Sequence, residues 1–170
     1  MAPRVVLVGP PGSGKSTVGP ILAQLLDVSF RDTDDDVASA AGMPLPEIFV
    51  AEGEQGFRDR ERTAIERALT EADGVVSLGG GAIESDEVRA NLADLIVVYL
   101  TVSSSEAAKR VGIDGPRPLM LGNVRTTWSR MLHRREPLYS SVATVSIATD
   151  DRDPADIAAD IVSALDRRQP

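Results

Sequence analysis

The chain has 170 residues and a mass of 18.1 kDa, which fits a single domain over residues 1–170. Hydrophobic residues make up 42% and charged residues 26%, so the composition is that of a folded protein and excludes a disordered chain. The net charge of −8 predicts that the chain binds no nucleic acid, and the lack of cysteine excludes disulfides and thiolate metal sites.

The N-terminus and the hydropathy pattern give no indication of a membrane protein. No apolar run approaches the roughly 18 residues that a membrane span needs. The opening MAPRVVLVG lacks the length and the cleavage site of a signal peptide. We therefore expect a cytoplasmic protein, without membrane partners, that acts as a monomer.

Strand-like and helix-like segments alternate along the chain. The hydrophobic pattern predicts strands over residues 5–8, 28–31, 75–78, 95–102 and 142–148, and helices over 15–26, 54–72 and 154–165. This alternation favours an α/β fold with a mainly parallel sheet, whose ligands bind beyond the carboxyl ends of the strands. Residues 112–124, GIDGPRPLMLGNV, are rich in glycine and proline and predict a long functional loop.

The first predicted strand leads directly into a phosphate-binding motif. The sequence GPPGSGKS at residues 9–16 fits G-x-x-x-x-G-K-[ST], between a strand and a helix as that motif requires. Its glycines let successive N–H groups converge on a phosphate, and the following helix adds its N-terminal dipole. Lys15 is expected to contact the β- and γ-phosphates, and Ser16 to offer its hydroxyl to Mg²⁺. The motif predicts nucleotide binding.

Residues after the second and third predicted strands are candidates for holding the acceptor of the phosphoryl group. The carboxylates of DTD at 32–34 could serve Mg²⁺ through water or accept hydrogen bonds from acceptor hydroxyls. Alternatively, Asp32 or Thr33 could cap the helix that follows. The glycines at 79–81 allow a ligand to approach the main chain closely, or they could form a flexible connector.

Three arginines are candidates for surface charges or for site residues. Arg58, in GFRDRE, could be a surface charge, with Glu61 placed to orient it at the i+3 position. Arg117, in the irregular segment, could close over the transferring phosphoryl group. Arg135, next to Arg134, could be a surface charge or part of a fork for an acceptor carboxylate.

Together these segments resemble a shikimate kinase along nearly the whole chain, with the nearest likeness to actinobacterial enzymes. The resemblance rests on GPPGSGKS, the DTD at 32–34, GEQGFRDRE at 53–61, SLGGGA at 77–82, RPL at 117–119 and RREPLY at 134–139. It implies a P-loop kinase fold with a five-stranded parallel sheet flanked by helices, a substrate-binding helical region at about 32–61 and a lid at about 112–124. The implied reaction is ATP-dependent phosphorylation of the 3-hydroxyl of shikimate, within the biosynthesis of chorismate and the aromatic amino acids.

The resemblance also implies residue roles on the nucleotide side. ATP would contact Gly12, Ser13, Gly14, Lys15, Ser16, Thr17, Arg110, Arg117 and Pro154. Among these, Arg110 and Pro154 would enclose the adenine ring. The cofactor Mg²⁺ would be served by Ser16 and by Asp32, the latter through water.

On the acceptor side, the resemblance implies a carboxylate fork and a set of polar contacts. Shikimate would contact Asp34, Arg58, Gly79, Gly80, Gly81 and Arg135. Arg58 and Arg135 would bind its carboxylate, and Asp34 would bind the reacting hydroxyl. Catalysis would depend on Lys15, Asp34 and Arg117.

Two other functions fit part of the pattern. A P-loop kinase for gluconate is the nearest rival because gluconate also carries a carboxylate and hydroxyls, whereas a nucleoside monophosphate would need base-recognising groups that we do not identify. A nucleotide-dependent switch is the alternative from a different class, although the chain has no N-K-x-D guanine motif. ADP release stimulated by shikimate, by gluconate or by neither would distinguish these possibilities.

Overall fold

Five parallel strands form one sheet in the computed structural model, which describes residues 2–112 and 121–168. The strand order is β2–β3–β1–β4–β5, and every neighbouring pair is parallel. The strands are β1 (Val5–Val8), β2 (Phe30–Asp32), β3 (Val75–Ser77), β4 (Val97–Thr101) and β5 (Val145–Ala148). Each overlaps a predicted strand, so the α/β class with a five-stranded parallel sheet is confirmed.

The central strand shows why the sheet is buried on both faces. All four residues of β1 are apolar and at most 2% exposed. Val5 and Leu7 belong to one hydrophobic core, whereas Val6 and Val8 belong to another, because successive side chains of a strand point to opposite faces. The strand therefore separates two cores, each covered by helices.

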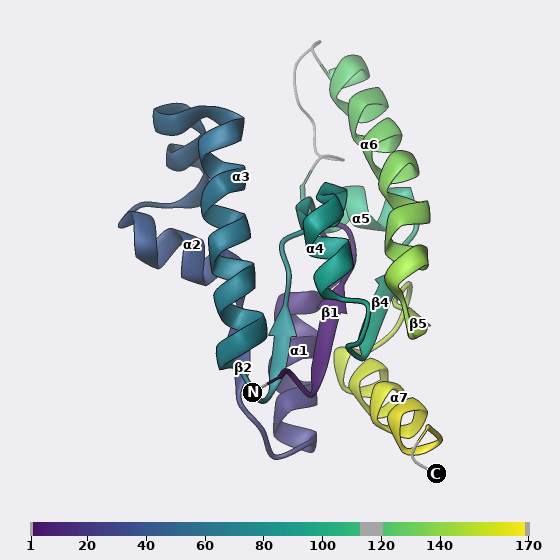
Figure 1. The fold of residues 1–170 in the computed structure, drawn as a ribbon. Coiled ribbons are helices and arrows are strands. Elements are labelled where there is room, and N and C mark those ends of the chain that lie inside the picture. The colour runs from purple at the N-terminus through teal and green to yellow at the C-terminus, as the bar shows by residue number, and fades with distance from the viewer. Residues whose placement is uncertain (1, 113–120, 169–170) are drawn as a thin grey trace.

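Helices cover both faces of the sheet (Figure 1). One core contains apolar residues of α1 (Lys15–Leu25) and α7 (Pro154–Asp166), and the other contains residues of α3 (Leu45–Glu71), α4 (Asp86–Asn91) and α6 (Leu121–Val142). The predicted helices at 15–26 and 154–165 are confirmed as α1 and α7. Within the described residues, no helix has the length and apolar character needed to cross a membrane.

Two helices form an arm beside the β2 edge of the sheet (Figure 1). The helical arm consists of α2 (Thr33–Ala41) and α3, which pack around a small core of Val37, Ile48, Phe57 and Ala64. The predicted helix at 54–72 is the second part of α3. A kink at Gly53, where φ is 72° and ψ is −179°, separates it from a first part that the hydrophobic pattern does not reveal.

The predicted loop at 112–124 is only partly described. Residues 113–120, which include Arg117, lie outside the described residues. Helix α5 (Ser104–Arg110) precedes the segment, and Gly112 follows that helix with a positive φ of 79°. Helix α6 begins at Leu121, so the prediction of irregular structure up to residue 124 was wrong for its last four residues.

The contact between α1 and β2 generates a stability prediction. A methyl group on Gly19 of α1 would lie 2.2 Å from Cε2 of the Phe30 ring. Helix propensity alone favours alanine by about 1 kcal/mol, but a clash this close costs about 1–3 kcal/mol. We therefore expect Gly19→Ala to lower the melting temperature measured by circular dichroism. Adding Phe30→Leu should recover part of the loss, whereas a raised melting temperature in Gly19→Ala would contradict the close contact.

Candidate active site

The phosphate loop joins β1 to α1 and holds its lysine tightly. Lys15, the first residue of α1, is only 9% exposed. Its Nζ donates hydrogen bonds to the carbonyl oxygens of Gly9 at 2.7 Å and Pro10 at 3.1 Å. Burial lowers the pKa of Lys15 to about 8, and the charges of Asp34 and Asp32 oppose that shift. The loop thus fixes one ammonium group at the end of the central strand.

Asp32, at the end of β2, makes contacts in two directions. Its Oδ1 accepts a hydrogen bond from the backbone N–H of Asp34 at 2.9 Å, so Asp32 is the N-cap of α2. Its Oδ2 accepts the hydroxyl of Ser16, also at 2.9 Å. The capping role and the predicted proximity to Ser16 are therefore both present in the structure.

The pair Ser16–Asp32 suits a cation that is held mainly by other ligands. Hydroxyl and carboxylate oxygens are hard donors, and Mg²⁺ is usually bound by one or two such groups together with phosphates and water. Among the residues that the structure describes, no three His, Asp or Glu side chains gather to hold a metal ion. The residues present fit a magnesium ion that arrives with a nucleotide.

Asp34, in the first turn of α2, lies against the glycine segment at residues 79–81. A methyl group on Gly79 would lie 2.6 Å from Oδ1 of Asp34 and 2.8 Å from Oε1 of Glu61. Burial raises the pKa of Asp34 to about 6; the charges of Asp32 and Glu61 add to the shift, and Lys15 opposes it. Asp34 is thus a carboxyl group that titrates close to neutral pH, beside the phosphate loop.

Arg58 reaches the same glycine segment from α3. Its Nη1 donates to Oε2 of Glu61 at 2.7 Å, so the predicted i+3 pair is confirmed. Its guanidinium lies 5.3 Å from the ring centre of Phe57. A methyl group on Gly81 would lie 2.5 Å from Nη2 of Arg58. Side chains therefore pack directly against the main chain of these glycines, which argues against a merely flexible connector.

Arg135, on α6, lies at the same site from the opposite side. It is 6% exposed, and its charge affects the pKa of both Lys15 and Glu61. Its Nη2 donates to Oε2 of Glu84 at 3.0 Å. The alternative that Arg135 is an ordinary surface charge was therefore wrong, because the side chain is buried beside the phosphate loop and the arm.

The sequence analysis missed two residues that hold α6 to the glycine segment. The hydroxyl of Tyr139 donates to the carbonyl oxygen of Gly80 at 2.5 Å, and Glu84, at the end of the 3₁₀ helix η1 (Ala82–Glu84), binds Arg135. Tyr139 lies in the motif RREPLY but was considered only as part of it. No sequence signal marks Glu84, because its partners lie 50 and 51 residues further along the chain.

Two adjoining clefts contain most of the nucleotide-side residues. One cleft of about 420 Å³ is lined by phosphate-loop residues together with Asp32, Asp34, Gly80 and Arg110. Another of about 400 Å³ is lined by Ser13, Gly14, Thr17, Arg110 and Pro154, among others. Arg110 lies in both clefts and donates to the carbonyl oxygens of Gly12 and Thr149, each at 3.0 Å. The structure thus brings Arg110 and Pro154 together beside the phosphate loop.

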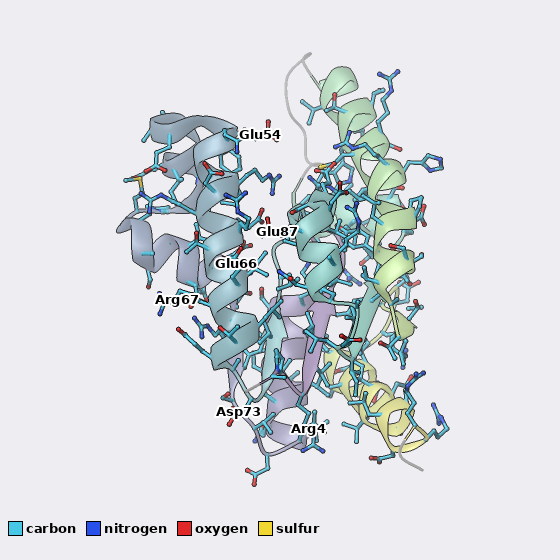
Figure 2. All side chains as sticks on the ribbon, viewed as in Figure 1. Arg4, Glu54, Glu66, Arg67, Asp73 and Glu87 are labelled. Atoms are coloured by element: carbon cyan, nitrogen blue, oxygen red, sulfur yellow. The ribbon has the colours of Figure 1, made fainter. Side chains whose placement is uncertain are left out.

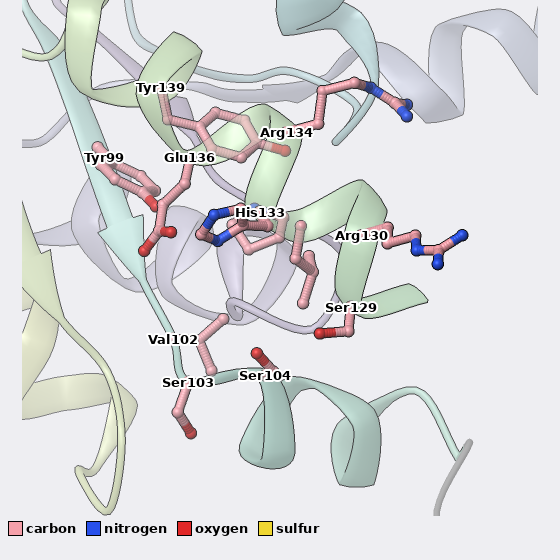
Figure 3. Close-up of a pocket in the computed structure, with 12 residues that line it drawn as sticks. Tyr99, Val102, Ser103, Ser104, Ser129, Arg130, His133, Arg134, Glu136 and Tyr139 are labelled. Carbon is pink, nitrogen blue, oxygen red and sulfur yellow. The ribbon is translucent and has the colours of Figure 1, made fainter. Parts of the chain in front are cut away.

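A third cleft, of about 600 Å³, lies between α5 and α6 and contains none of the predicted site residues. His133 and Glu136 are among its lining residues, and Glu136 points toward Tyr99 (Figure 3). Arg134 lies at the edge of this cleft, and its side chain points away from the centre (Figure 3). Glu136, although adjacent to Arg135 in sequence, is therefore directed away from the phosphate-loop site.

The fold and the site define a P-loop kinase in which a cluster of arginines and carboxylates adjoins the phosphate loop. The family model for shikimate kinase matches residues 11–166. The chain therefore belongs to the shikimate kinase family, as the sequence motifs predicted. This membership favours the shikimate kinase interpretation over the gluconate kinase and the nucleotide-dependent switch.

Individual relatives agree with this assignment. The chain is 50% identical to the shikimate kinase of Salinispora arenicola over 97% of this chain and 99% of that protein. It is 52% identical to the shikimate kinase of Saccharopolyspora erythraea, over 91% and 89% of the two chains. The solved structure of Acinetobacter baumannii shikimate kinase, in complex with shikimate, matches with a TM-score of 0.89 and 35% identity, over 100% and 96% of the chains.

The raised pKa of Asp34 predicts a pH-dependent cost to stability. Its pKa rises from 3.8 to about 6 on folding, so between these values the folded protein keeps a proton that the unfolded chain has released. The contribution of Asp34 to stability therefore falls as pH rises through this window, by roughly 2–3 kcal/mol at most. Asp34→Asn should consequently be more stable than the parent at pH 8, with a smaller or reversed difference at pH 4.

Urea denaturation at the two pH values measures this effect. Asp35→Asn is the matched control, because Asp35 is the exposed neighbour in the same helical turn. It should change stability by a similar amount at both pH values. An equal effect of Asp34→Asn at pH 4 and pH 8 would show that burial of the Asp34 charge does not cost stability.

Proposed function

We propose that this protein transfers the γ-phosphoryl group of ATP to the 3-hydroxyl of shikimate, releasing ADP and shikimate 3-phosphate. The observation that carries the proposal is the convergence of Lys15, Asp34, Arg58 and Arg135 around the glycine segment and the phosphate loop. A phosphoryl donor and a hydroxylated carboxylic acid need these groups in one place. Membership of the shikimate kinase family supports this choice of acceptor.

The acceptor half of the site suits a single carboxylate flanked by hydroxyls. Arg58 and Arg135 bind the carboxylate, because guanidinium groups form charge-assisted hydrogen bonds with it. The main chain at 79–81 is bare of side chains and lets the ring approach closely. Asp34 accepts a hydrogen bond from the reacting hydroxyl and fixes its direction toward the γ-phosphorus.

In the transfer step, the hydroxyl oxygen forms a bond to the γ-phosphorus, and the bond from that phosphorus to the β,γ-bridging oxygen breaks. The electron pair of the broken bond leaves with ADP, and the hydroxyl proton moves to Asp34. Above about pH 6 the Asp34 carboxyl is ionised and can accept that proton. Lys15 stabilises the negative charge that develops on the β- and γ-phosphate oxygens.

The nucleotide half of the site is assigned on the same basis. The phosphate-loop residues 12–17 bind the phosphates, and Arg110 and Pro154 enclose adenine. Arg117, which lies outside the described residues, is proposed to act on the transferring phosphoryl group. Ser16 and Asp32, the latter through water, would hold Mg²⁺, which supplies charge neutralisation on the phosphates when it is bound.

The remaining parts of the proposal concern the state of the protein in the cell. We propose that the protein acts as a monomer. The substrates are ATP and a small acid, which supports a cytoplasmic location. The net charge of −8 supports the absence of nucleic-acid partners.

The decisive experiment measures ADP release from Mg·ATP by the purified protein, alone, with shikimate and with gluconate. We expect strong stimulation by shikimate and none by gluconate. Stimulation by gluconate alone would replace the acceptor in this proposal. A slow ATPase activity indifferent to both acids would favour a nucleotide-dependent switch.

Removing one arginine of the fork should separate acceptor binding from nucleotide binding. Arg58→Ala is expected to raise the KM for shikimate roughly 10- to 100-fold, because a charge-assisted hydrogen bond is lost. The KM for ATP should change by less than about twofold, because Arg58 does not line the nucleotide clefts. Arg60→Ala is the matched control, since Arg60 lies two residues away and pairs with Glu52. Equal increases in both KM values for Arg58→Ala would indicate a structural role instead.

A further inference from the structure

Glu84 connects the glycine segment to two successive residues of α6. Its Oε1 accepts a hydrogen bond from Nε of Arg134 at 2.8 Å and forms an ion pair with Nη2 of the same residue at 2.7 Å. Its Oε2 accepts from Nη2 of Arg135 at 3.0 Å. One carboxylate at the end of η1 thus binds two guanidinium groups, and only one of them belongs to the proposed acceptor site.

The two arginines differ in how much they depend on Glu84. The side chain of Arg134 is 61% exposed, so water can satisfy it, whereas that of Arg135 is 7% exposed. The Nε of Arg135 is buried and has no hydrogen-bond partner in the structure. Glu136, the adjacent carboxylate in sequence, points toward Tyr99 in a different cleft (Figure 3). Among the described residues, Glu84 is the carboxylate that fixes the Arg135 guanidinium.

The position of α6 itself has a separate support. Tyr139, one turn after Arg135, is 1% exposed, stacks on Tyr99 and donates its hydroxyl to the Gly80 carbonyl. This contact holds the helix against the glycine segment without involving Glu84. Variants at Glu84 keep this contact of α6, so they should fold.

The charges around Glu84 match an acceptor with one carboxylate. Arg134, Arg135 and Glu84 together carry a net charge of +1, and the pair Arg58–Glu61 is neutral. Hydrogen bonding from Arg134 and the charge of Arg135 outweigh the effect of partial burial and keep the pKa of Glu84 below its usual value. The carboxylate is therefore ionised at neutral pH and leaves the arginine set one unpaired positive charge.

We propose that Glu84 is a positioning residue, which holds the Arg135 guanidinium in the orientation that binds the acceptor carboxylate. The inference rests on the proposed function, in which Arg135 contacts that carboxylate. The hydrogen bond from Nη2 to Glu84 restricts rotation of the Arg135 guanidinium. A guanidinium that is already ordered loses less conformational entropy when the acceptor binds, so the preorganised pair favours binding.

Glu84→Gln tests the proposal, because the amide keeps the shape of the side chain and removes its charge. We expect the KM for shikimate to rise roughly three- to tenfold, while kcat and the KM for ATP change by less than about twofold. Glu87→Gln is the matched control. Glu87 lies on α4, near α3 (Figure 2), and among the described ion pairs its carboxylate approaches Arg62, at 3.9 Å, and not Arg135. An unchanged or lowered KM for shikimate in Glu84→Gln would overturn the proposal.

Two further measurements distinguish a positioning role of Glu84 from a general structural or electrostatic effect. In an Arg135→Ala background, Glu84→Gln should raise the KM for shikimate no further. With the neutral methyl ester of shikimate as acceptor, Glu84→Gln should leave the KM unchanged. A full additional rise in the Arg135→Ala background, or an equal penalty with the ester, would show that Glu84 does not act through Arg135.

The same set of variants distinguishes failure of this inference from failure of the proposed function. If Arg135→Ala alone leaves the KM for shikimate unchanged, the assignment of Arg135 to the carboxylate is wrong and the role of Glu84 falls with it. If Arg135→Ala raises that KM but Glu84→Gln does not, only the role of Glu84 is wrong. If Glu84→Gln does not fold, Glu84→Asp replaces it in these measurements. Aspartate keeps the charge but is too short to reach Arg135 in the same way, so the KM for shikimate should rise by the same factor.

Discussion

The site depends on the absence of side chains at residues 79–81. Side chains from three separate parts of the chain approach these glycines more closely than a methyl group would allow: Asp34 and Glu61 at Gly79, Pro11 at Gly80 and Arg58 at Gly81. The helical arm, the phosphate loop and the segment after β3 therefore meet at a stretch of bare main chain. The two halves of the proposed reaction, donor and acceptor, come into contact at this point.

The electrostatics of the site follow from this crowding. Carboxylates and guanidinium groups are brought together in half-buried or buried positions, and each arginine has a specific partner: Arg58 pairs with Glu61, and Arg135 with Glu84. Among the described residues, no arginine pairs with Asp34, and burial raises the pKa of its carboxyl to about 6. A chain with a net charge of −8 thus still gathers Lys15, Arg58 and Arg135 in one place.

Features of this site could be predicted from the sequence where the interacting residues are close together along the chain. Contacts between residues far apart along the chain could not be predicted. The phosphate loop, the residues DTD at 32–34 and the Arg58–Glu61 pair are local patterns, and their local geometry is as expected. The predicted strands were also found, because buried β-branched runs are a local signal. The contact of Glu84 with α6 joins residues 50 apart or more and follows only from the folded chain. The first part of α3, before the Gly53 kink, was missed because its hydrophobic residues serve a small separate core and not the sheet.

That separate core has a consequence for the energetics of the molecule. Val37, Ile48, Phe57 and Ala64 pack on one another in the helical arm, outside the two clusters that bury the sheet. A unit with its own small core can open locally at a lower free energy than global unfolding requires. Amide hydrogens of the arm would then exchange with solvent sooner than those of β1, and an acceptor held by Asp34 and Arg58 would slow that exchange selectively. In this architecture, substitutions in the core of the arm can change the affinity for the acceptor. They can do so without changing the free energy of unfolding of the sheet.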